Sequence, residues 1–386
     1  MNKHLISIAL ASALASASVS AEIELSGFAS IVGGVTTSSD EKLYDYNDNI
    51  DFAQGSLFAL QASSDLGNGL GVTVQLAAEG ANEWDPDFKW AYVSYDASDS
   101  LRILAGRQRV PFFMYSDFLD VSYAYGWVAP PKDLYDGAVF DTFDGLGAVY
   151  TTNFGDVDAT FHGVYGRNLD PLKLDDVVQP AATQFNDLTG LSATLTYDWL
   201  TLRAGYVVTD MTISFDGIES LKTLAGAWQA VGQAGIAQDI LVEEDQVVFT
   251  EFGFQINLEQ VIVVGEYITI GLDDTPFADE DAYYVMAGYQ FDKTLVHVTY
   301  GANEENPDDN FTSAVPFGLD PGLDALKAGT EGFVQRQVSD TNYVTVGVRY
   351  DFHESAALKV EYTDYSNDLD STLDAGLFRV ALVTVF

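Results

Sequence analysis

Period-two alternation of side-chain character runs through most of this chain and limits the folds that it can adopt. Near the C-terminus every second residue is apolar, as in Val344, Val346, Val348, Tyr350 and Phe352. Residues 200–206 and 356–363 alternate in the same way. Successive side chains of a strand point to opposite faces, so each segment has one apolar and one polar or small face. Alternating segments of about ten residues are typical of transmembrane β-barrels, although the shorter strands of soluble sandwiches also alternate.

The spacing of the connections favours the barrel, because short turns alternate with long loops along the chain. The predicted short turns are residues 65–69, 96–100, 153–156, 197–201, 257–260, 291–294 and 353–355. The predicted long loops are residues 36–50, 81–87, 107–142, 167–188, 209–244, 271–281, 302–340 and 366–375. Seven turns and eight loops separate sixteen strands. We therefore expect an all-β fold, a 16-stranded antiparallel transmembrane β-barrel with its turns at one rim and its loops at the other.

Aromatic residues recur beside the short turns, where they would meet the membrane–water interface. These predicted girdle residues are Tyr95, Phe154, Trp199, Phe291, Phe352 and Phe386.

Residues 1–21 have the features of a secretory signal peptide. Lys3 precedes an apolar stretch, Leu5–Leu14, and Val19-Ser20-Ala21 supplies small residues for cleavage. We expect a single barrel domain over residues 22–386. The sequence contains no cysteine, so backbone pairing and packing must stabilise it.

Charge excludes one class of partner. Without Lys3, 16 Lys and Arg stand against 58 Asp and Glu. Such an excess of acid argues against binding to nucleic acid and favours cations or well-solvated loops.

The stretch from Arg107 to Asp136 is too long and too rich in aromatics for an ordinary surface connection. We expect it to fold inward, inside the barrel. Residues 215–237, in another long loop, are predicted to hold a short helix. The acidic loop clusters lack EF-hand spacing and the chain has no GxSxG or HExxH motif, so we predict no metal site, no cofactor and no enzyme activity.

Several motifs resemble those of the trimeric Gram-negative general porins. They are the signal peptide, the first strand EIELSGFASI, the hairpin SLFALQASSDLGNGLGVTVQL, Gly106-Arg107-Gln108 before the third loop, and the terminal Phe386. The resemblance implies a third loop that narrows the barrel and a homotrimer in the outer membrane, in contact with outer-membrane lipid and lipopolysaccharide. It also implies that Phe386 is the signal read by the assembly machinery.

The family has a ladder of basic residues facing acids of the third loop. Strand phase matches Lys89 to one ladder position, but the other two matching residues are Leu57 and Phe143. The resemblance therefore implies the following pore constriction: Lys89, Arg107, Arg109, Asp117 and Asp120. Arg107 and Arg109 would either set a field across the pore or tie the loop down. The polar phase of other strands predicts further residues of the lumen wall, namely Arg203, Arg349, Lys359, Glu361 and Arg379.

These features predict a passive diffusion channel for small hydrophilic solutes and ions, with a weak preference for cations. One alternative is a channel selective for anions, phosphate or oligosaccharides, in which the aromatic third loop serves as a sugar slide. Another is an adhesin or phage-receptor barrel whose long loops are the functional part.

Overall fold

The computed structural model describes residues 22–137, 140–170, 182–214, 219–272, 275–307 and 311–386. The predicted signal peptide lies outside this part of the chain. The described residues form sixteen strands: β1 (Ile23–Thr36), β2 (Leu57–Gly67), β3 (Leu70–Glu79), β4 (Pro86–Ser98), β5 (Leu101–Arg109), β6 (Thr142–Phe154), β7 (Val157–Asn168), β8 (Ala182–Tyr197), β9 (Leu200–Ser214), β10 (Glu243–Leu258), β11 (Val261–Leu272), β12 (Asp279–Phe291), β13 (Thr294–Asn306), β14 (Ser339–His353), β15 (Ala356–Asn367) and β16 (Ala375–Val385).

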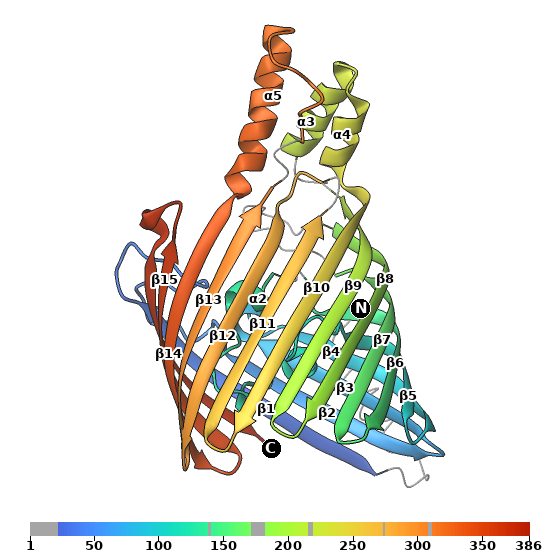
Figure 1. Cartoon of the computed structure of the whole chain (residues 1–386), viewed down its shortest axis with the longest axis vertical. Helices are drawn as coiled ribbons and strands as arrows, with labels where there is room; N and C mark the ends of the chain where they lie inside the picture. The colour runs from blue at the N-terminus through green and yellow to red at the C-terminus, as the bar shows by residue number, and fades with distance from the viewer. Residues whose placement is uncertain (1–21, 138–139, 171–181, 215–218, 273–274, 308–310) are drawn as a thin grey trace.

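Every strand pairs antiparallel with its neighbours in sequence, and β1 pairs with β16 to close the barrel. The predicted strand number and fold class are therefore confirmed. The seven short turns fall where the alternation predicted them, and all lie at one rim, opposite the long loops (Figure 1). A closed barrel leaves no strand edge unpaired. This matters in a bilayer, where no water can bind the backbone groups of an open edge.

The two faces of the wall are opposite in character to those of a soluble protein. Along β14 the apolar Val344, Val346 and Val348 are exposed, whereas Thr345 between them is buried. The six predicted girdle residues are all exposed as well. Apolar side chains that point outward, with polar ones inside, fit a wall that faces lipid.

The long loops carry the helices. α2 (Lys132–Tyr135) lies in the third loop, and α3 (Glu219–Ala230) and α4 (Ala234–Leu241) lie between β9 and β10. α5 (Pro321–Val334) lies between β13 and β14 and was not predicted, although Asp320 caps it and Pro321 opens it. The described residues also form five 3₁₀ segments: Gly80–Asn82, Ser116–Phe118, Ser122–Ala124, Gln335–Gln337 and Ser371–Leu373. Among the described residues, no helix has the length and apolar character needed to cross a membrane.

Helices α3, α4 and α5 project beyond the long-loop rim (Figure 1). They share an apolar cluster that includes the fully buried Trp228, whose Nε1 donates to Thr330 Oγ1 at 2.9 Å. This packing orders two long loops that are far apart in the sequence.

The third loop, residues 110–141, packs against the inner face of the wall. Its buried aromatic side chains join one cluster with Phe249, Ile268 and Tyr284 of β10, β11 and β12. α2 also contacts β12 and β13. Aromatic packing thus places the loop across the interior, as its composition predicted.

Candidate pore constriction

Basic residues of the wall hold the backbone of the third loop on one side. Lys359 Nζ is completely buried and donates to the carbonyl oxygens of Ser122, Tyr125 and Trp127. Arg349 Nη1 donates to the carbonyls of Tyr123 and Tyr125 at 2.7 and 2.8 Å. A loop inside a barrel cannot satisfy its carbonyl groups within a strand ladder, so these cations replace that ladder.

Wall carboxylates hold the loop amides in the same way. Glu361 accepts from Val128 N at 2.8 Å and from Arg379 Nη2 at 3.0 Å. Glu266 accepts from Met114 N at 2.8 Å and from the hydroxyls of two buried tyrosines, Tyr135 and Tyr284. The loop is therefore fixed to β11, β14 and β15 by both its donors and its acceptors.

Arg203 continues this set of contacts on β9. Its Nη2 donates to Pro111 O at 2.7 Å, and its Nε lies 3.2 Å from Glu251 Oε2. Together with Arg349, Lys359, Glu361 and Arg379, it faces the interior. All five predicted lumen-wall residues contact the third loop or another member of this set.

The opposite side of the loop meets a cluster of charges. Lys89 Nζ of β4 lies 2.8 Å from Glu79 Oε1 and 3.8 Å from Asp141 Oδ2. Arg109 pairs with Asp120 of the third loop and with Asp141 at its end. We call these five residues the charge cluster. It brings together three of the residues predicted for the constriction and adds two acids that the sequence did not single out.

The acids of the charge cluster are more accessible than its bases. The side chains of Asp141 and Glu79 are 38% and 30% exposed, and that of Asp120 is 14% exposed. Lys89 is 12% exposed and Arg109 only 2%. The two cations are covered while the carboxylates are presented to the interior.

The protonation of the two loop acids follows from their burial and their cations. Burial raises the pKa of Asp120, against the pull of Arg109 and Lys89. Burial acts to raise the pKa of Asp141 too, but there Arg109 and Lys89 prevail and hold it below its ordinary value. Asp141 therefore stays ionised at neutral pH and supplies lasting negative charge.

Two of the cavities beside the third loop are lined by residues predicted for the constriction. One, of about 190 Å³, is lined by β1–β3 residues such as Ser30 and Glu79 and by Asp120 and Tyr125 of the loop. The other, of about 250 Å³, lies towards the short turns. Its lining includes Arg102, His162, Arg203 and Asp117. Asp117 is thus on the other side of the loop from Asp120, and the two carboxylates do not act as one pair.

Arg107 is separated from the rest of the predicted constriction. It pairs with Asp144 and Asp170, both at 3.1 Å, and in the β5–β6 register it lies two residues along from the Ala105–Leu146 pair, on the same face. Leu146 is exposed on the outer face. Arg107 therefore belongs to the outer face near the long-loop rim, and we leave it out of the constriction proposed below.

Leu57 and Phe143, matched to ladder positions, both face the interior as apolar residues. Leu57 packs in a buried cluster with Phe28 and with Val121 of the third loop. Phe143 is fully buried in the aromatic cluster under the loop. At these two ladder positions the chain therefore has apolar side chains that pack against the third loop, and no basic residue.

Phe386 lies at the end of the closing strand. Its backbone exchanges hydrogen bonds with Gly27 of β1 at 2.8 and 2.9 Å, and its exposed ring stacks on Phe58 at 6.1 Å. No group of three or more potential metal ligands occurs among the described residues. The acidic pairs at 273–274 and 308–309 lie outside the described residues.

Comparison with known proteins agrees with this architecture. A sequence profile described as Gram-negative porin matches residues 7–370. Among curated proteins none matches the chain.

Similar solved structures include the outer-membrane channel DcaP of Acinetobacter baumannii, with a TM-score of 0.61, 9% identity and coverage of 96% of this chain and 99% of that one. An anion-selective porin from Comamonas acidovorans has a TM-score of 0.56 and 14% identity, covering 95% and 100%. A loop-deletion mutant of OmpT, an outer-membrane protein of Vibrio cholerae, has a TM-score of 0.57 and 14% identity, covering 95% and 99%. These likenesses show the fold, and the profile shows the family. The chain belongs to the Gram-negative porins and is a β-barrel channel of the outer membrane.

Proposed function

We propose that this porin is a passive diffusion channel for small hydrophilic solutes and ions, and that solutes pass between the third loop and the wall formed by β1–β5. The loop is fixed to β10–β16 by apolar packing and by bonds to wall charges. A cavity of about 190 Å³ and the charge cluster lie on its other side. The narrowest part of this route is formed by the charge cluster, with Lys89, Arg109 and Asp120 as its predicted members.

A weak preference for cations is the selectivity that the charge cluster supports. Three carboxylates face two cations there, and the carboxylates are the more exposed. The cations of the wall are occupied with loop carbonyls, so they offer little free positive charge to a passing anion. Acidic outer loops add cations at the mouth, within about 10 Å at 0.1 M salt.

Single-channel recording of the refolded protein in planar bilayers tests this proposal. In a salt gradient we expect reversal potentials that favour potassium over chloride at low salt, with the preference fading as salt rises. A preference for chloride at low salt would overturn the proposed selectivity. No conductance from correctly folded barrels would overturn the channel itself.

The alternative of a sugar slide meets an obstacle in the burial of the aromatics. Tyr115, Tyr125 and Trp127 are buried against the wall, and Tyr123 Oη donates to Glu354 O at 2.9 Å. A slide needs rings that face the passing sugar, and among the described third-loop aromatics only Phe118 is exposed. The structure therefore favours a general channel over an oligosaccharide channel.

A receptor role is the second candidate, and the projecting helices favour it. α3, α4 and α5 stand beyond the rim on an apolar cluster of their own, and Phe317 and Leu319 are exposed beside α5. Deleting residues 311–334 tests it, because conductance should persist while adhesion of cells or phage is lost. Unchanged adhesion would remove this candidate.

Trimer formation and assembly through Phe386 remain proposals taken from the family. Phe386 is exposed next to the closing strand, where an assembly factor can reach it. Deleting it should lower the amount of folded protein in the outer membrane. Cross-linking of intact membranes tests the trimer, and a monomer as the largest species would exclude it.

A further inference from the structure

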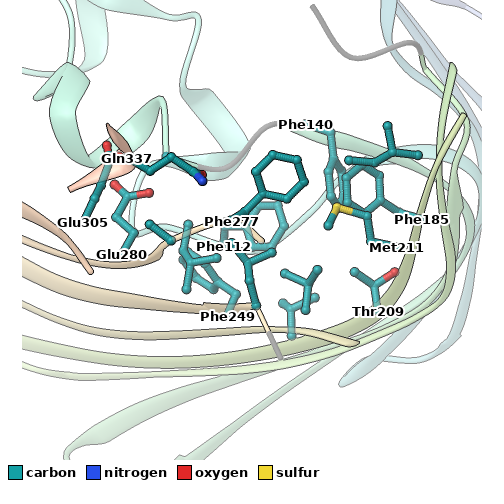
Figure 2. A pocket seen from close by; sticks show the side chains of 17 residues that line it. Phe112, Phe140, Phe185, Thr209, Met211, Phe249, Phe277, Glu280, Glu305 and Gln337 are labelled. Atoms are coloured by element: carbon teal, nitrogen blue, oxygen red, sulfur yellow. The ribbon is translucent and has the colours of Figure 1, made fainter. Parts of the chain in front are cut away.

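A cavity of about 270 Å³ lies between the third loop and strands β8–β13, away from the proposed solute route. Its walls come from β8–β13, from Phe112 and Phe140 of the third loop and from Phe277 before β12 (Figure 2). A designed protein cavity of about 150 Å³ is known to hold benzene. This larger space can accept an aromatic ring with a short chain attached.

Most of the lining is aromatic or aliphatic. Phe112 packs against Phe249 with ring centroids 4.6 Å apart, and Phe140 packs against Phe185 at 4.3 Å. These contacts hold the rings in place on wall strands and on the anchored loop. A rigid apolar lining gives binding energy to an apolar ligand without the cost of ordering the site.

One end of the cavity is polar. Figure 2 shows Glu280, Glu305 and Gln337 gathered there, away from Phe185 and Met211. Glu280 and Glu305 are directly opposite each other on β12 and β13. Like charges in that position repel each other and destabilise a sheet.

No basic side chain offsets this repulsion in the described part of the chain. The ion pairs between described residues do not include Glu280 or Glu305. Within the described residues, the Glu280 carboxylate accepts a hydrogen bond from a neutral group, since Asn303 Nδ2 donates to Glu280 Oε1 at 2.8 Å. A cation placed between the two carboxylates would relieve the repulsion and receive two charge-assisted hydrogen bonds.

The geometry points to a binding site for a small amphipathic amine, with its aromatic body among the phenylalanines and its ammonium group between Glu280 and Glu305. The rings add a weak attraction for the cation through their π faces. The site lies off the route proposed for solutes. Its occupation therefore goes beyond passive diffusion, and binding does not depend on conductance.

Calorimetry on the detergent-solubilised barrel tests the site with three matched probes: 2-phenylethylamine, 2-phenylethanol and 3-phenylpropanoate. We expect the amine to bind about tenfold more tightly than the alcohol, because two charged acceptors meet its ammonium group. The carboxylate should bind more weakly than the alcohol. Equal affinities of the amine and the alcohol would overturn the proposal, and this comparison needs no variant.

The Glu280→Gln/Glu305→Gln double variant should abolish the preference for the amine and leave binding of the alcohol unchanged. Asp281→Asn/Glu304→Gln is the matched control, because Asp281 and Glu304 are also directly opposite on the same strands, one position along. This control removes the same charge from the opposite face. Equal losses in both double variants would show a general charge effect and contradict the site.

Val247→Phe places a ring in the cavity and should abolish binding of both the amine and the alcohol. Heat-modifiable migration on gels shows whether each variant is folded. A folded Val247→Phe barrel that still binds the amine as the wild type does would place the ligand elsewhere.

Discussion

The two sides of the third loop differ in how they meet the wall. Towards β10–β16, the sealed side, its aromatics are buried and its backbone groups bond to Glu266, Glu361 and Lys359. Towards β2–β5, the open side, it meets the charge cluster and a cavity. The same kinds of ionic side chain fix the loop on one side and remain accessible on the other. The difference shows that the role of a wall charge depends on whether loop backbone reaches it.

The largest expected effect comes from the sealed side. Lys359→Met keeps the apolar stem but leaves the carbonyls of Ser122 and Trp127 without their donor, while the carbonyl of Tyr125 keeps its bond from Arg349. We expect the free energy of unfolding to fall by about 3 kcal/mol, since buried carbonyl groups are left unsatisfied. Denaturant titration of the refolded barrel measures it. Lys293→Met, at an exposed turn, is the control and should change the free energy of unfolding little. Similar losses in both variants would show that the contacts of Lys359 to the loop do not stabilise the barrel.

The second prediction concerns pH at α2. Burial raises the pKa of Asp133 to about 6, although its bond from Tyr44 acts in the opposite direction. The folded barrel therefore holds this proton over a range where the unfolded chain has lost it, so the contribution of Asp133 to stability falls as pH rises from about 4 to 6. The total is at most about 3 kcal/mol for a shift of roughly two units. The difference in the free energy of unfolding between wild type and Asp133→Asn over that pH range isolates the contribution of Asp133. Parallel pH profiles of the two proteins would contradict the prediction.

On the open side, Glu79→Gln with Asp141→Asn should change selectivity more than stability. The charge cluster would pass from a net charge of about −1 to about +1. At about 8 Å in water, each unit charge changes the energy of a passing ion by about 0.5 kcal/mol, with opposite signs for potassium and chloride. Removing two carboxylate charges therefore lowers the potassium-to-chloride permeability ratio by at most about 30-fold, and screening by salt reduces this change. Reversal potentials at low salt measure the ratio. Asp144→Asn on the outer face is the control, and an equal shift there would show that the route does not pass the charge cluster.

The smallest effect is expected for Asp117→Asn with Asp120→Asn. Asp120 is the least exposed acid of the charge cluster, and Asp117 lies beyond the loop near Arg203. We expect the permeability ratio to fall by less than about 1.5-fold at 0.1 M salt, where screening already limits such charges. A decrease larger than that of Glu79→Gln with Asp141→Asn would move the constriction to the third loop itself.

The strands and turns were predictable from the sequence because a wall that faces lipid follows one rule: along each strand, apolar side chains point outward and polar ones inward. The inner charges Arg349, Lys359 and Glu361 followed from the same rule, since their strand phase is polar within the membrane belt. The rule does not hold near the long-loop rim. There Arg107 and Asp144 pair with each other on the outer face, and Phe143 points inward because the third loop covers it.

Local irregularities also hide side-chain direction from a sequence pattern. Lys89 lies where the β3–β4 register shifts between Gln75 and Leu76, so simple alternation does not give its face. Gly106 adopts a φ of +130° and approaches Ala91 so closely that a Cβ would lie 2.3 Å from its carbonyl oxygen. Glu79 and Asp141 are partners that only the folded loop creates. The sequence indicated these partners only indirectly, because buried cations such as Lys89 and Arg109 need acidic residues close by.

The pairing of β1 with β16 sets a condition on how this protein can reach its native state. Residues at the two extremes of the chain must find each other, so the ring closes only after the whole chain has been made. Until then two strand edges are open and ready to pair with other chains. Contacts this distant in sequence also form slowly. The polypeptide must therefore spend its transit to the outer membrane under protection from aggregation, and folding has to be concerted with insertion.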